Sequence, residues 1–445
     1  MSMPEYNLHY EITGGEPIYG DIHCMGAKNL ATKVMIAAIL GESTTTLYNV
    51  PSIGDVDITV KMLRSIGADI SWENNVMKIN PKTVHSANVL MPDSRTNRIP
   101  ILLLSILLQK FDHVVVPHVG GDKIGERNIT FHIEALKSFG ASIVYHDNSY
   151  KASKNGKLRK SHINLPYPSV GATETCIFLG VLAKGTSVIK NVAIEPEIIE
   201  LITMLSSMGA IIIIGNNREI TIHGVDRLFG TEFTIIGDRI EAVSWASLAG
   251  ASDGKIRVSG IKPGLLCNFY PYYQMAGCGY TCISDNIIEF FRKKKLSPVS
   301  IETDVYPGFA TDWQQTFAIM LTQAEGISVI HETVHDNRMS YLKVITELGA
   351  NVQSSTSCLG SVPCRYRSLN HEHSAIIAGK THLKSIKESI KIPDLRAGLA
   401  YVIAAAVAEG KTILSATDQI HRGYGNLTER LKNTNLKIKV YPISE

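Results

Sequence analysis

The 445-residue sequence predicts an α/β protein with two lobes, and two recurring patterns are the reason. In the first pattern, an apolar helical segment ends in Gly-Ala and a strand follows. In the second, a helix ends at Gly or a polar turn, and an alternating strand rich in β-branched residues follows. Together they describe a unit of two helices and several strands in about 70 residues. Six such units fit the chain, which predicts three per lobe and a ligand site in the cleft between the lobes.

The first pattern recurs at nearly constant spacing. The segment LKNTNLKIKV near the C-terminus fits a further copy that has lost its glycine. Gly-Ala could be only a favoured helix stop, but near-identical contexts at a regular interval of about 70 residues make that explanation poor. The copies are VKMLRSIGADI, IEALKSFGASI, ITMLSSMGAIII and VITELGANV, with glycines at Gly67, Gly140, Gly209 and Gly349, and the degenerate YYQMAGCGYTCI at Gly277.

The second pattern appears in four places, ILGESTTTLYNV, VLAKGTSVIKNV, TQAEGISVIHETV and VAEGKTILSATD.

The composition, 44% hydrophobic and 19% charged, is that of a globular protein. A net charge of +3 is too small to indicate a nucleic-acid or acidic-lipid partner. The N-terminus has no apolar signal region, and the longest apolar run, IPILLLSILL, is about half a bilayer span.

The seven cysteines are scattered and odd in number, and no CxxC pair or zinc-type spacing with histidine occurs. Disulfides are typical of oxidising compartments, and zinc sites have short, regular ligand spacings. We therefore expect a reduced cytoplasmic protein, a monomer, without a metal or a cofactor.

In the first half, charged residues fall at predicted helix starts. Lys28, in GAKN, lies between a strand-like segment and a helix, where free N–H groups and the helix dipole favour an anion. Arg98 opens the apolar helix IPILLLSILL, with Pro100 at an early helical position. Arg127 ends the charged loop VGGDKIGERN just before the next helix. Each of these side chains could instead be solvated, but their repetition indicates a polyanionic ligand.

The second half repeats this arrangement. Asp312, in FATDWQQTF, is expected to be a helix N-cap. Arg338, Arg396 and Arg422 lie in loops before or within helix starts. Such arginines are usually solvated, yet their common place in the repeat favours a shared cleft. No G-x-S-x-G, P-loop or Rossmann fingerprint occurs, which argues against a hydrolase, a kinase or a dehydrogenase.

From about Tyr10 to the C-terminus, the chain resembles the enolpyruvyl transferases. Nine motifs, which follow one another in the order typical of that family, carry the resemblance. GAKN does not match the GSKS-like start that usually marks the shikimate-pathway branch. The chain is more similar to the branch that acts on UDP-N-acetylglucosamine. The motifs are GAKN, GG-x-x-IG-x-R, SVGAT, EPEI, DRIE, F-x-TD, ET-x-x-x-NR, DLRA and RGY.

The resemblance implies a two-lobed inside-out α/β barrel with six βαβαββ-like repeats, three per lobe. One lobe would span 28–236 with a lid loop at about 118–128, and the other 1–27 plus 237–445, with the active site in the cleft. The implied reaction transfers enolpyruvyl from phosphoenolpyruvate to the sugar 3-hydroxyl and releases phosphate. It passes through a tetrahedral ketal and uses no metal. It is the first committed step of peptidoglycan synthesis, and thus serves cell-wall biogenesis, cell shape and cell division.

The resemblance also implies roles for individual residues. Phosphoenolpyruvate is a small trianion, which fixed cations must bind in place of water. The implied catalytic residues are Lys28, Asp122 as general acid, Asp312 as base and Arg422. The implied phosphoenolpyruvate-binding residues are Lys28, Asn29, Arg127, Arg338, Arg396 and Arg422. The implied nucleotide-sugar-binding residues are Asn29, Arg98, Arg127, Thr130, Ser169, Val170, Gly171, Asp312 and Val334.

Four positions depart from the family pattern. Asp122 stands where most members have Cys, so we expect the protein to be insensitive to fosfomycin, an epoxide that alkylates that thiol. Thr130 replaces a usual Asp, Tyr167 a usual Lys and Leu102 a usual Trp. Because the last three lie around the nucleotide-sugar, an enolpyruvyl transferase with another nucleotide acceptor in secondary metabolism is the alternative. An inactive nucleotide-sugar sensor is a third hypothesis.

Overall fold

The computed structural model describes residues 8–90, 97–118, 120, 129–336, 338–362, 364–367, 369–392 and 398–442. These residues form two compact units. We call residues 26–236 the central unit, and residues 8–25 with 237–442 the terminal unit. The sequence analysis placed the first boundary between the lobes after residue 27, and in the structure the first segment of the terminal unit ends at Met25.

The sheets repeat one pattern in both units. Within the described residues there are five four-stranded sheets and one three-stranded sheet. In each four-stranded sheet an edge strand pairs in parallel with its neighbour, and the remaining pairs are antiparallel. In the three-stranded sheet an isolated parallel bridge between Asn88 and Val115 of β6 takes the place of the parallel edge strand, among the described residues. The prediction of six βαβαββ repeats, three per unit, is thereby confirmed.

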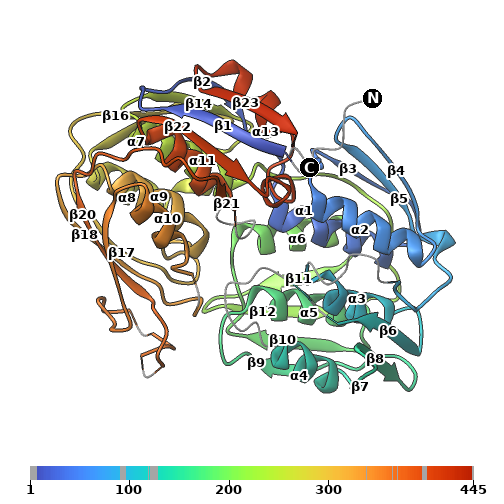
Figure 1. Cartoon of the computed structure of the whole chain (residues 1–445). Helices are drawn as coiled ribbons and strands as arrows, with labels where there is room; N and C mark the ends of the chain where they lie inside the picture. The colour runs from blue at the N-terminus through green and yellow to red at the C-terminus, as the bar shows by residue number, and fades with distance from the viewer. Residues whose placement is uncertain are drawn as a thin grey trace. The chain divides into compact units, whose positions relative to one another are not determined.

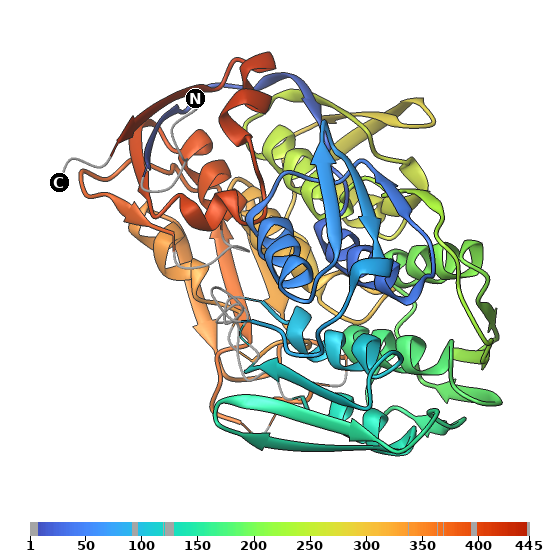
Figure 2. The ribbon, with the colours of Figure 1, turned by 90° about the vertical axis from the view of Figure 1, so that its right-hand side faces the viewer.

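The central unit contains the sheets β13-β3-β5-β4, β6-β8-β7 and β11-β12-β10-β9. The β7–β8 hairpin runs along the outer edge of this unit (Figure 2). Its elements are α1 (Lys28–Ala37), η1 (Ala38–Leu40), β3 (Thr45–Tyr48), α2 (Gly54–Ser65), β4 (Asp69–Glu73), β5 (Val76–Asn80), η2 (Pro81–Thr83), α3 (Ile99–Leu107), β6 (His113–Pro117), α4 (Thr130–Ser138), β7 (Ala141–His146), β8 (Ser149–Lys154), β9 (His162–Asn164), α5 (Val170–Gly180), β10 (Thr186–Lys190), α6 (Pro196–Ser207), β11 (Ile211–Ile214), β12 (Glu219–His223) and β13 (Glu232–Thr234).

The terminal unit contains the sheets β21-β22-β1-β23, β15-β16-β14-β2 and β17-β18-β20-β19. Both chain ends contribute, because β1 pairs with β22 and β23. Its elements are β1 (Leu8–Gly14), β2 (Tyr19–His23), α7 (Arg239–Ala251), β14 (Lys255–Ser259), η4 (Pro263–Leu266), α8 (Tyr270–Met275), β15 (Cys278–Ser284), β16 (Ile287–Arg292), β17 (Ser300–Glu302), η5 (Thr311–Trp313), α9 (Gln314–Leu321), β18 (Gly326–His331), α10 (Tyr341–Glu347), β19 (Asn351–Ser355), β20 (Ser374–Gly379), β21 (Ile390–Lys391), α11 (Gly398–Val407), β22 (Gly410–Ser415), α12 (Asp418–His421), α13 (Leu427–Arg430), η6 (Leu431–Asn433) and β23 (Lys437–Pro442).

One helix of each repeat lies inside its unit. In the terminal unit α7, α9 and α11 pack on one another, with the sheets outside them (Figure 1). All residues of α7 and α9 are buried, including polar ones such as Glu241 and Gln314, as expected for helices enclosed on every side. In the central unit α3 packs against both α1 and α5. This arrangement, with helices within and sheets outside, is the predicted inside-out barrel.

The predicted glycine helix stops have a common geometry. Gly67, Gly140, Gly209, Gly277 and Gly349 all have φ between 94° and 105°. This left-handed conformation ends a helix and turns the chain into the next strand, and a side chain disfavours it. The recurring glycine therefore follows from backbone geometry. No helix in the described part of the chain has the length and hydropathy of a membrane span.

Candidate active site

The first candidate residues lie at the start of α1, the inner helix of the first repeat in the central unit. Lys28 is its first residue and is buried. The N–H of Ala27 donates to the carbonyl of Ile236 (2.7 Å), and a Cβ on Gly26 would lie 2.0 Å from the carbonyl oxygen of Asn49. Only glycine therefore fits before this turn. The first turn of α1 contains no acidic side chain, so its positive dipole end favours an anion.

Arg98 lies at the N-cap of α3, as expected. Arg98 is half-buried, and this burial lowers the pKa of its guanidinium. Its charge also acts on His132 of α4. Burial, and secondly Arg98, lower the pKa of His132 to about 3. The His132 imidazole is therefore neutral at physiological pH.

His132 connects the starts of α4 and α5. Its Nδ1 lies 2.7 Å from Oγ1 of Thr175, and a Cβ on Gly171 would lie 2.9 Å from its Cε1. Thr130 is the first residue of the same helix, α4. The structure thus brings Arg98, Gly171 and the start of α4 together around one buried histidine. Its position in FHIEALKS carries no functional signal, and sequence reasoning missed it.

Ser169 and Val170 begin α5. Ser169 is the N-cap, and its Oγ accepts a bond from the N–H of Ala172 (3.4 Å). Val170 is exposed at 38%, an unusual place for an apolar side chain at a helix start. Each of the inner helices α1, α3 and α5 therefore begins at or beside a predicted site residue.

In the terminal unit, Asp312 pairs with Arg338. The Oδ1 of Asp312 lies 2.5 Å from Nη2 of Arg338, whose side chain is completely buried. The prediction that Asp312 is an N-cap is wrong: it lies within η5, whose N-cap is Ala310. Its carboxylate binds the guanidinium and does not cap a helix. The Nε and Nη1 of Arg338 have no hydrogen-bond partner among the described residues, so the guanidinium retains donors for a further acceptor.

Glu332 connects the segment that contains Thr311 to the segment that contains Val334 through hydrogen bonds. Its buried carboxylate accepts from the Thr311 hydroxyl (2.7 Å) and from the N–H groups of Val334 (2.6 Å) and His335 (2.8 Å). Burial raises the pKa of Glu332, although these donors and Arg338 favour its charged form. Glu332 belongs to the ET-x-x-x-NR motif, but no role was predicted for it.

Arg422 lies at the C-cap of α12, and its Nη1 donates to Oε1 of Gln419 (3.1 Å). Three predicted site residues, Asp122, Arg127 and Arg396, lie outside the described residues. Their roles stay predictions.

One group of the described residues bears on the expectation that the protein has no metal site. His331, Cys358, Cys364 and His373 come together in the terminal unit in an arrangement that could hold a metal ion. Three of these residues lie in the connection between β19 and β20, and the fold brings His331 of β18 beside them.

The fold defines the class of protein. The chain superimposes on the enolpyruvyl transferase NikO from Streptomyces tendae with a TM-score of 0.83 and 19% identity, covering 99% of this chain and all of that one. An EPSP synthase from Acinetobacter baumannii gives 0.72 and 15%, covering 98% of this chain and all of that one. The family model of EPSP synthase (3-phosphoshikimate 1-carboxyvinyltransferase) matches residues 12–431, and the chain belongs to this family.

Curated relatives extend the similarity. The UDP-N-acetylglucosamine 1-carboxyvinyltransferase of Protochlamydia amoebophila is 42% identical over 438 residues, 97% of this chain and 94% of that protein. The enzyme of the same name from Chlamydia pneumoniae is 44% identical, over 98% and 95%. UDP-N-acetylglucosamine 1-carboxyvinyltransferase 2 of Bacillus subtilis is 33% identical, over 96% and 95%.

Proposed function

We propose that this protein transfers the enolpyruvyl group of phosphoenolpyruvate to the 3-hydroxyl of UDP-N-acetylglucosamine and releases phosphate. The observation that carries the proposal is the identity of 42–44% over nearly the full length of relatives named for this activity. This similarity favours the UDP-N-acetylglucosamine reaction over another nucleotide acceptor, even though Thr130, Tyr167 and Leu102 depart from the family pattern.

The buried pair of the terminal unit supports the chemistry. Addition of the sugar hydroxyl to C2 of phosphoenolpyruvate requires a base for the hydroxyl proton, and we assign this role to Asp312. Arg338 orients the Asp312 carboxylate through a contact of 2.5 Å between Nη2 and Oδ1. The unpaired N–H groups of Arg338 are suited to a carboxylate or a phosphate oxygen.

The remaining cations are proposed to bind the trianion. Lys28, at the α1 N-terminus, would neutralise phosphate charge. We assign Arg422, Arg127 and Arg396 to the same substrate, with Asn29 beside Lys28. Arg98, Thr130, the α5 start and Val334 are assigned to the nucleotide-sugar. That the central and terminal units act on one pair of substrates is part of this proposal.

Phosphate release from phosphoenolpyruvate, measured against a panel of nucleotide-sugars and nucleotides, tests the assignment. We expect release with UDP-N-acetylglucosamine, with a product heavier by one enolpyruvyl group in mass spectrometry. The Asp312→Asn variant should lose roughly 10²–10⁴-fold in kcat, the usual contribution of a general base. Release only with another acceptor would establish the alternative, and release with none would favour the nucleotide-sugar sensor.

We further propose that Asp122 is the general acid that protonates the vinyl carbon. A carboxyl group has an ordinary pKa near 3.9, so it must be raised to donate near neutral pH. Bound phosphoenolpyruvate would raise it through like-charge repulsion. The Asp122→Asn variant should lose activity at every pH, whereas Asp122→Cys should keep activity and shift its pH profile. An unimpaired Asn variant would contradict the role.

The same residue predicts the response to fosfomycin. A carboxylate is a far weaker nucleophile toward the epoxide than a thiolate, so the protein should form no adduct. Asp122→Cys should form one, detectable by mass spectrometry of the peptide that contains residue 122. An adduct on the unmodified peptide would refute the prediction.

We also propose that the protein acts as a cytoplasmic monomer on small-molecule substrates in peptidoglycan synthesis. All seven cysteines are free thiols, which fits a reducing compartment. Light scattering coupled to size-exclusion chromatography should give the mass of one chain, and a dimer would overturn the monomer assignment.

A further inference from the structure

Two histidines and two cysteines of the terminal unit meet at one end of the β17-β18-β20-β19 sheet. His331 is the last residue of β18, and His373 directly precedes β20. Cys358 and Cys364 lie in the segment 356–373 that connects β19 to β20. We call His331, Cys358, Cys364 and His373 the His-Cys cluster. Each offers one ligand atom, and these atoms all lie within 4.8 Å of one another.

We propose that the His-Cys cluster binds one zinc ion, which fastens the 356–373 segment to the sheet. Two thiolates and two imidazoles are a typical structural zinc set. The proposal is independent of the proposed function, because none of the four residues belongs to the assigned substrate-binding set.

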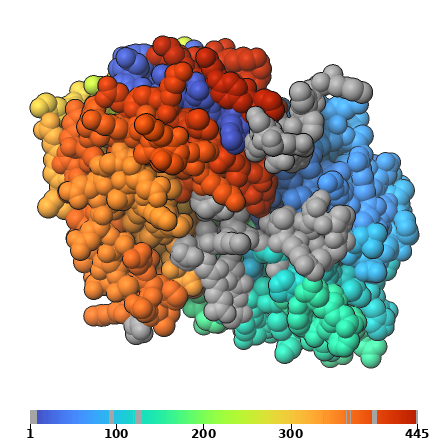
Figure 3. Space-filling view, viewed as in Figure 1, coloured from blue at the N-terminus to red at the C-terminus, as the bar shows by residue number. Residues whose placement is uncertain are grey.

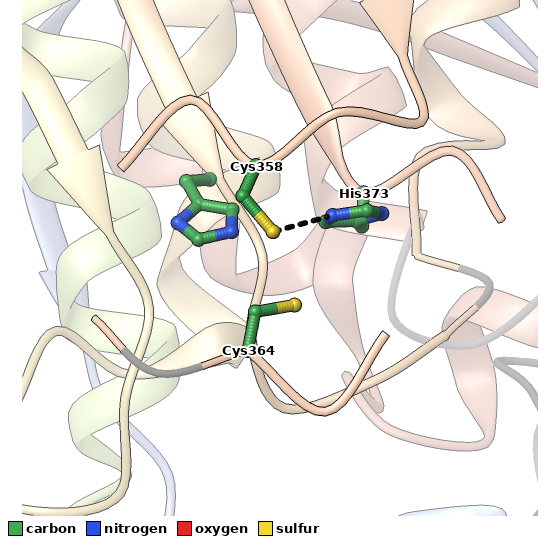
Figure 4. Close-up of side chains that lie close together, drawn as sticks. Cys358, Cys364 and His373 are labelled. Atoms are coloured by element: carbon green, nitrogen blue, oxygen red, sulfur yellow. Dashed lines mark hydrogen bonds between the residues drawn. The ribbon is translucent and has the colours of Figure 1, made fainter. Parts of the chain in front are cut away.

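The histidine hydrogen bonds support a metal site. Nδ1 of His373 lies 2.7 Å from the carbonyl oxygen of His371, so this nitrogen carries the proton. The other nitrogen, Nε2, is then unprotonated and lies 3.4 Å from Sγ of Cys358 (Figure 4). Metal-binding histidines usually donate their second N–H in this way, which fixes the tautomer that can bind the ion.

His331 provides an independent observation. Its Nδ1 lies 3.3 Å from Oε2 of Glu302, a carboxylate–histidine pair. Its Nε2 is buried and has no hydrogen-bond partner within the described parts of the chain. A buried polar atom without a partner costs roughly 1–3 kcal/mol. A metal ion bound at Nε2 removes this cost, and the carboxylate–histidine–zinc arrangement is a recurrent one.

The separations also fit a four-coordinate ion. With Zn–S near 2.3 Å and Zn–N near 2.0 Å, tetrahedral ligand atoms are about 3.3–3.8 Å apart. The 3.4 Å from Cys358 to His373 agrees with this value. The largest separation, within 4.8 Å, requires only a small inward movement. The sulfur of Cys364 points toward Cys358 and His373 in Figure 4.

Cys364 receives a backbone hydrogen bond, and both cysteines are accessible from solvent. The N–H of Tyr366 lies 3.3 Å from Sγ of Cys364 and donates to it. Both cysteines are half-buried, so an ion can reach them from solvent. Binding would release the two thiol protons to solvent, and the two thiolate charges would neutralise the dication.

The 356–373 segment is irregular and exposed. It contains no helix or strand where it is described, most of its residues are exposed, and it lies on the surface of the terminal unit (Figure 3). Irregular segments longer than about 12–15 residues are uncommon unless something holds them. Leu359 and Leu369 are 40% and 47% exposed, whereas Tyr366 is buried, so Tyr366 provides most of the apolar packing among the described residues of the segment.

The segment also forms hydrogen bonds to Val334, one of the candidate site residues. Oε2 of Glu302 accepts from the N–H of Val362 (2.7 Å). The Tyr366 hydroxyl and Arg365 Nη2 donate to the carbonyl oxygen of Val334 at 2.7 Å and 2.5 Å. Val334 is assigned to the nucleotide-sugar. A metal ion in the His-Cys cluster would thus stabilise the segment that supports Val334.

Metal analysis of the purified full-length protein tests the proposal directly. Protein purified without a metal-affinity step should contain about one zinc per chain by elemental mass spectrometry. After removal with a chelator under reducing conditions, Co²⁺ should bind with the intense visible bands of a tetrahedral site and thiolate-to-cobalt absorption. Cys358→Ser and His331→Asn should each weaken binding more than 10-fold. Glu302→Gln, which removes the carboxylate behind His331, should weaken it roughly 10–100-fold.

Cys282→Ser is the matched control, because Cys282 is an exposed free cysteine of the same unit outside the cluster. It should keep the full metal content and the wild-type cobalt spectrum. The wild-type measurement needs no variant, so a variant that fails to fold does not decide the matter. Wild type that binds neither zinc nor cobalt, or a cobalt spectrum without thiolate absorption, would overturn the proposal. A Cys358–Cys364 disulfide in protein prepared under reducing conditions would overturn it as well.

Discussion

At the scale of single residues, Arg338 shows how the fold prepares for an anion. Its side chain is completely buried, and Asp312 satisfies only part of it. A buried guanidinium with unpaired donors is costly. In the proposed site a substrate oxygen would remove that cost, and part of the binding free energy would come from donors that the folded chain already holds in place.

Glu174, on the buried face of α5, gives a pH prediction. Burial raises its pKa from 4.5 to about 7, and the nearby Glu195 and Glu197 add to the shift, while Lys33 opposes it. The folded state therefore binds this proton more tightly than the unfolded chain. The contribution of Glu174 to stability is full below pH 4.5 and is lost as pH rises to about 7.

Glu174→Gln removes this titration. The variant should resemble wild type in stability near pH 5 and exceed it at pH 8, by up to about 3 kcal/mol or several degrees in Tm. Thermal unfolding across this pH range measures the difference. Glu73→Gln, at an exposed glutamate of the same unit, should follow the wild-type pH profile. A Glu174→Gln profile parallel to wild type would contradict the shift.

At the scale of elements, the glycines that end helices are the most directly testable feature. Gly140 has φ 94°, and a Cβ there would meet no atom within 4 Å. Gly140→Ala should therefore cost only the backbone strain of a left-handed residue, roughly 1–2 kcal/mol. Gly67→Ala should cost more, because its Cβ would lie 2.2 Å from Nδ1 of His85.

The control for this series is Gly264, in η4, where neither crowding nor backbone strain opposes a side chain. A Cβ there would meet nothing within 4 Å, and its φ is not in the left-handed region. Gly264→Ala should change stability by less than about 0.5 kcal/mol. Thermal and denaturant unfolding of the three variants measures the loss of stability, which should be largest for Gly67→Ala and smallest for Gly264→Ala. Equal effects at Gly140 and Gly264 would show that the left-handed geometry is not what selects glycine.

At the scale of the whole molecule, the chain connectivity separates the two units. All strands of the central unit lie between residues 45 and 234, and β13 pairs with β3 to complete the first sheet. The terminal unit needs both chain ends, because β1 pairs with β22 and β23. The central unit is thus a continuous segment, and the terminal unit is not.

A fragment of residues 26–236 should therefore fold by itself, with a cooperative thermal transition in circular dichroism. It should not release phosphate, since Asp312 and Arg338 belong to the terminal unit. A fragment ending at residue 227 lacks β13 and should be less stable. A 26–236 fragment without a cooperative transition would show that the unit depends on the rest of the chain.

Much of the fold could be predicted because each repeat shows the same local pattern in the sequence, a helix that ends at a glycine before a strand. At the five recurring Gly-Ala-type helix ends the chain takes a left-handed conformation before the next strand, and glycine adopts that conformation with the least strain. Several candidate site residues stand out for a related reason, since they lie at the starts of inner helices, where charge or polarity interrupts an apolar run. Their individual roles were implied by the family resemblance.

The sequence by itself determined the repeat, the helix ends and the family, because these depend on neighbouring residues and on ordered motifs. Only the tertiary structure decided which distant side chains meet. His132 reaches Thr175, Glu332 orders Thr311 and Val334, and Asp312 binds Arg338 when it was expected to cap a helix. The His-Cys cluster is the extreme case, since the pairing of β18 with β20 brings His331 beside His373, and the 356–373 segment adds the two cysteines.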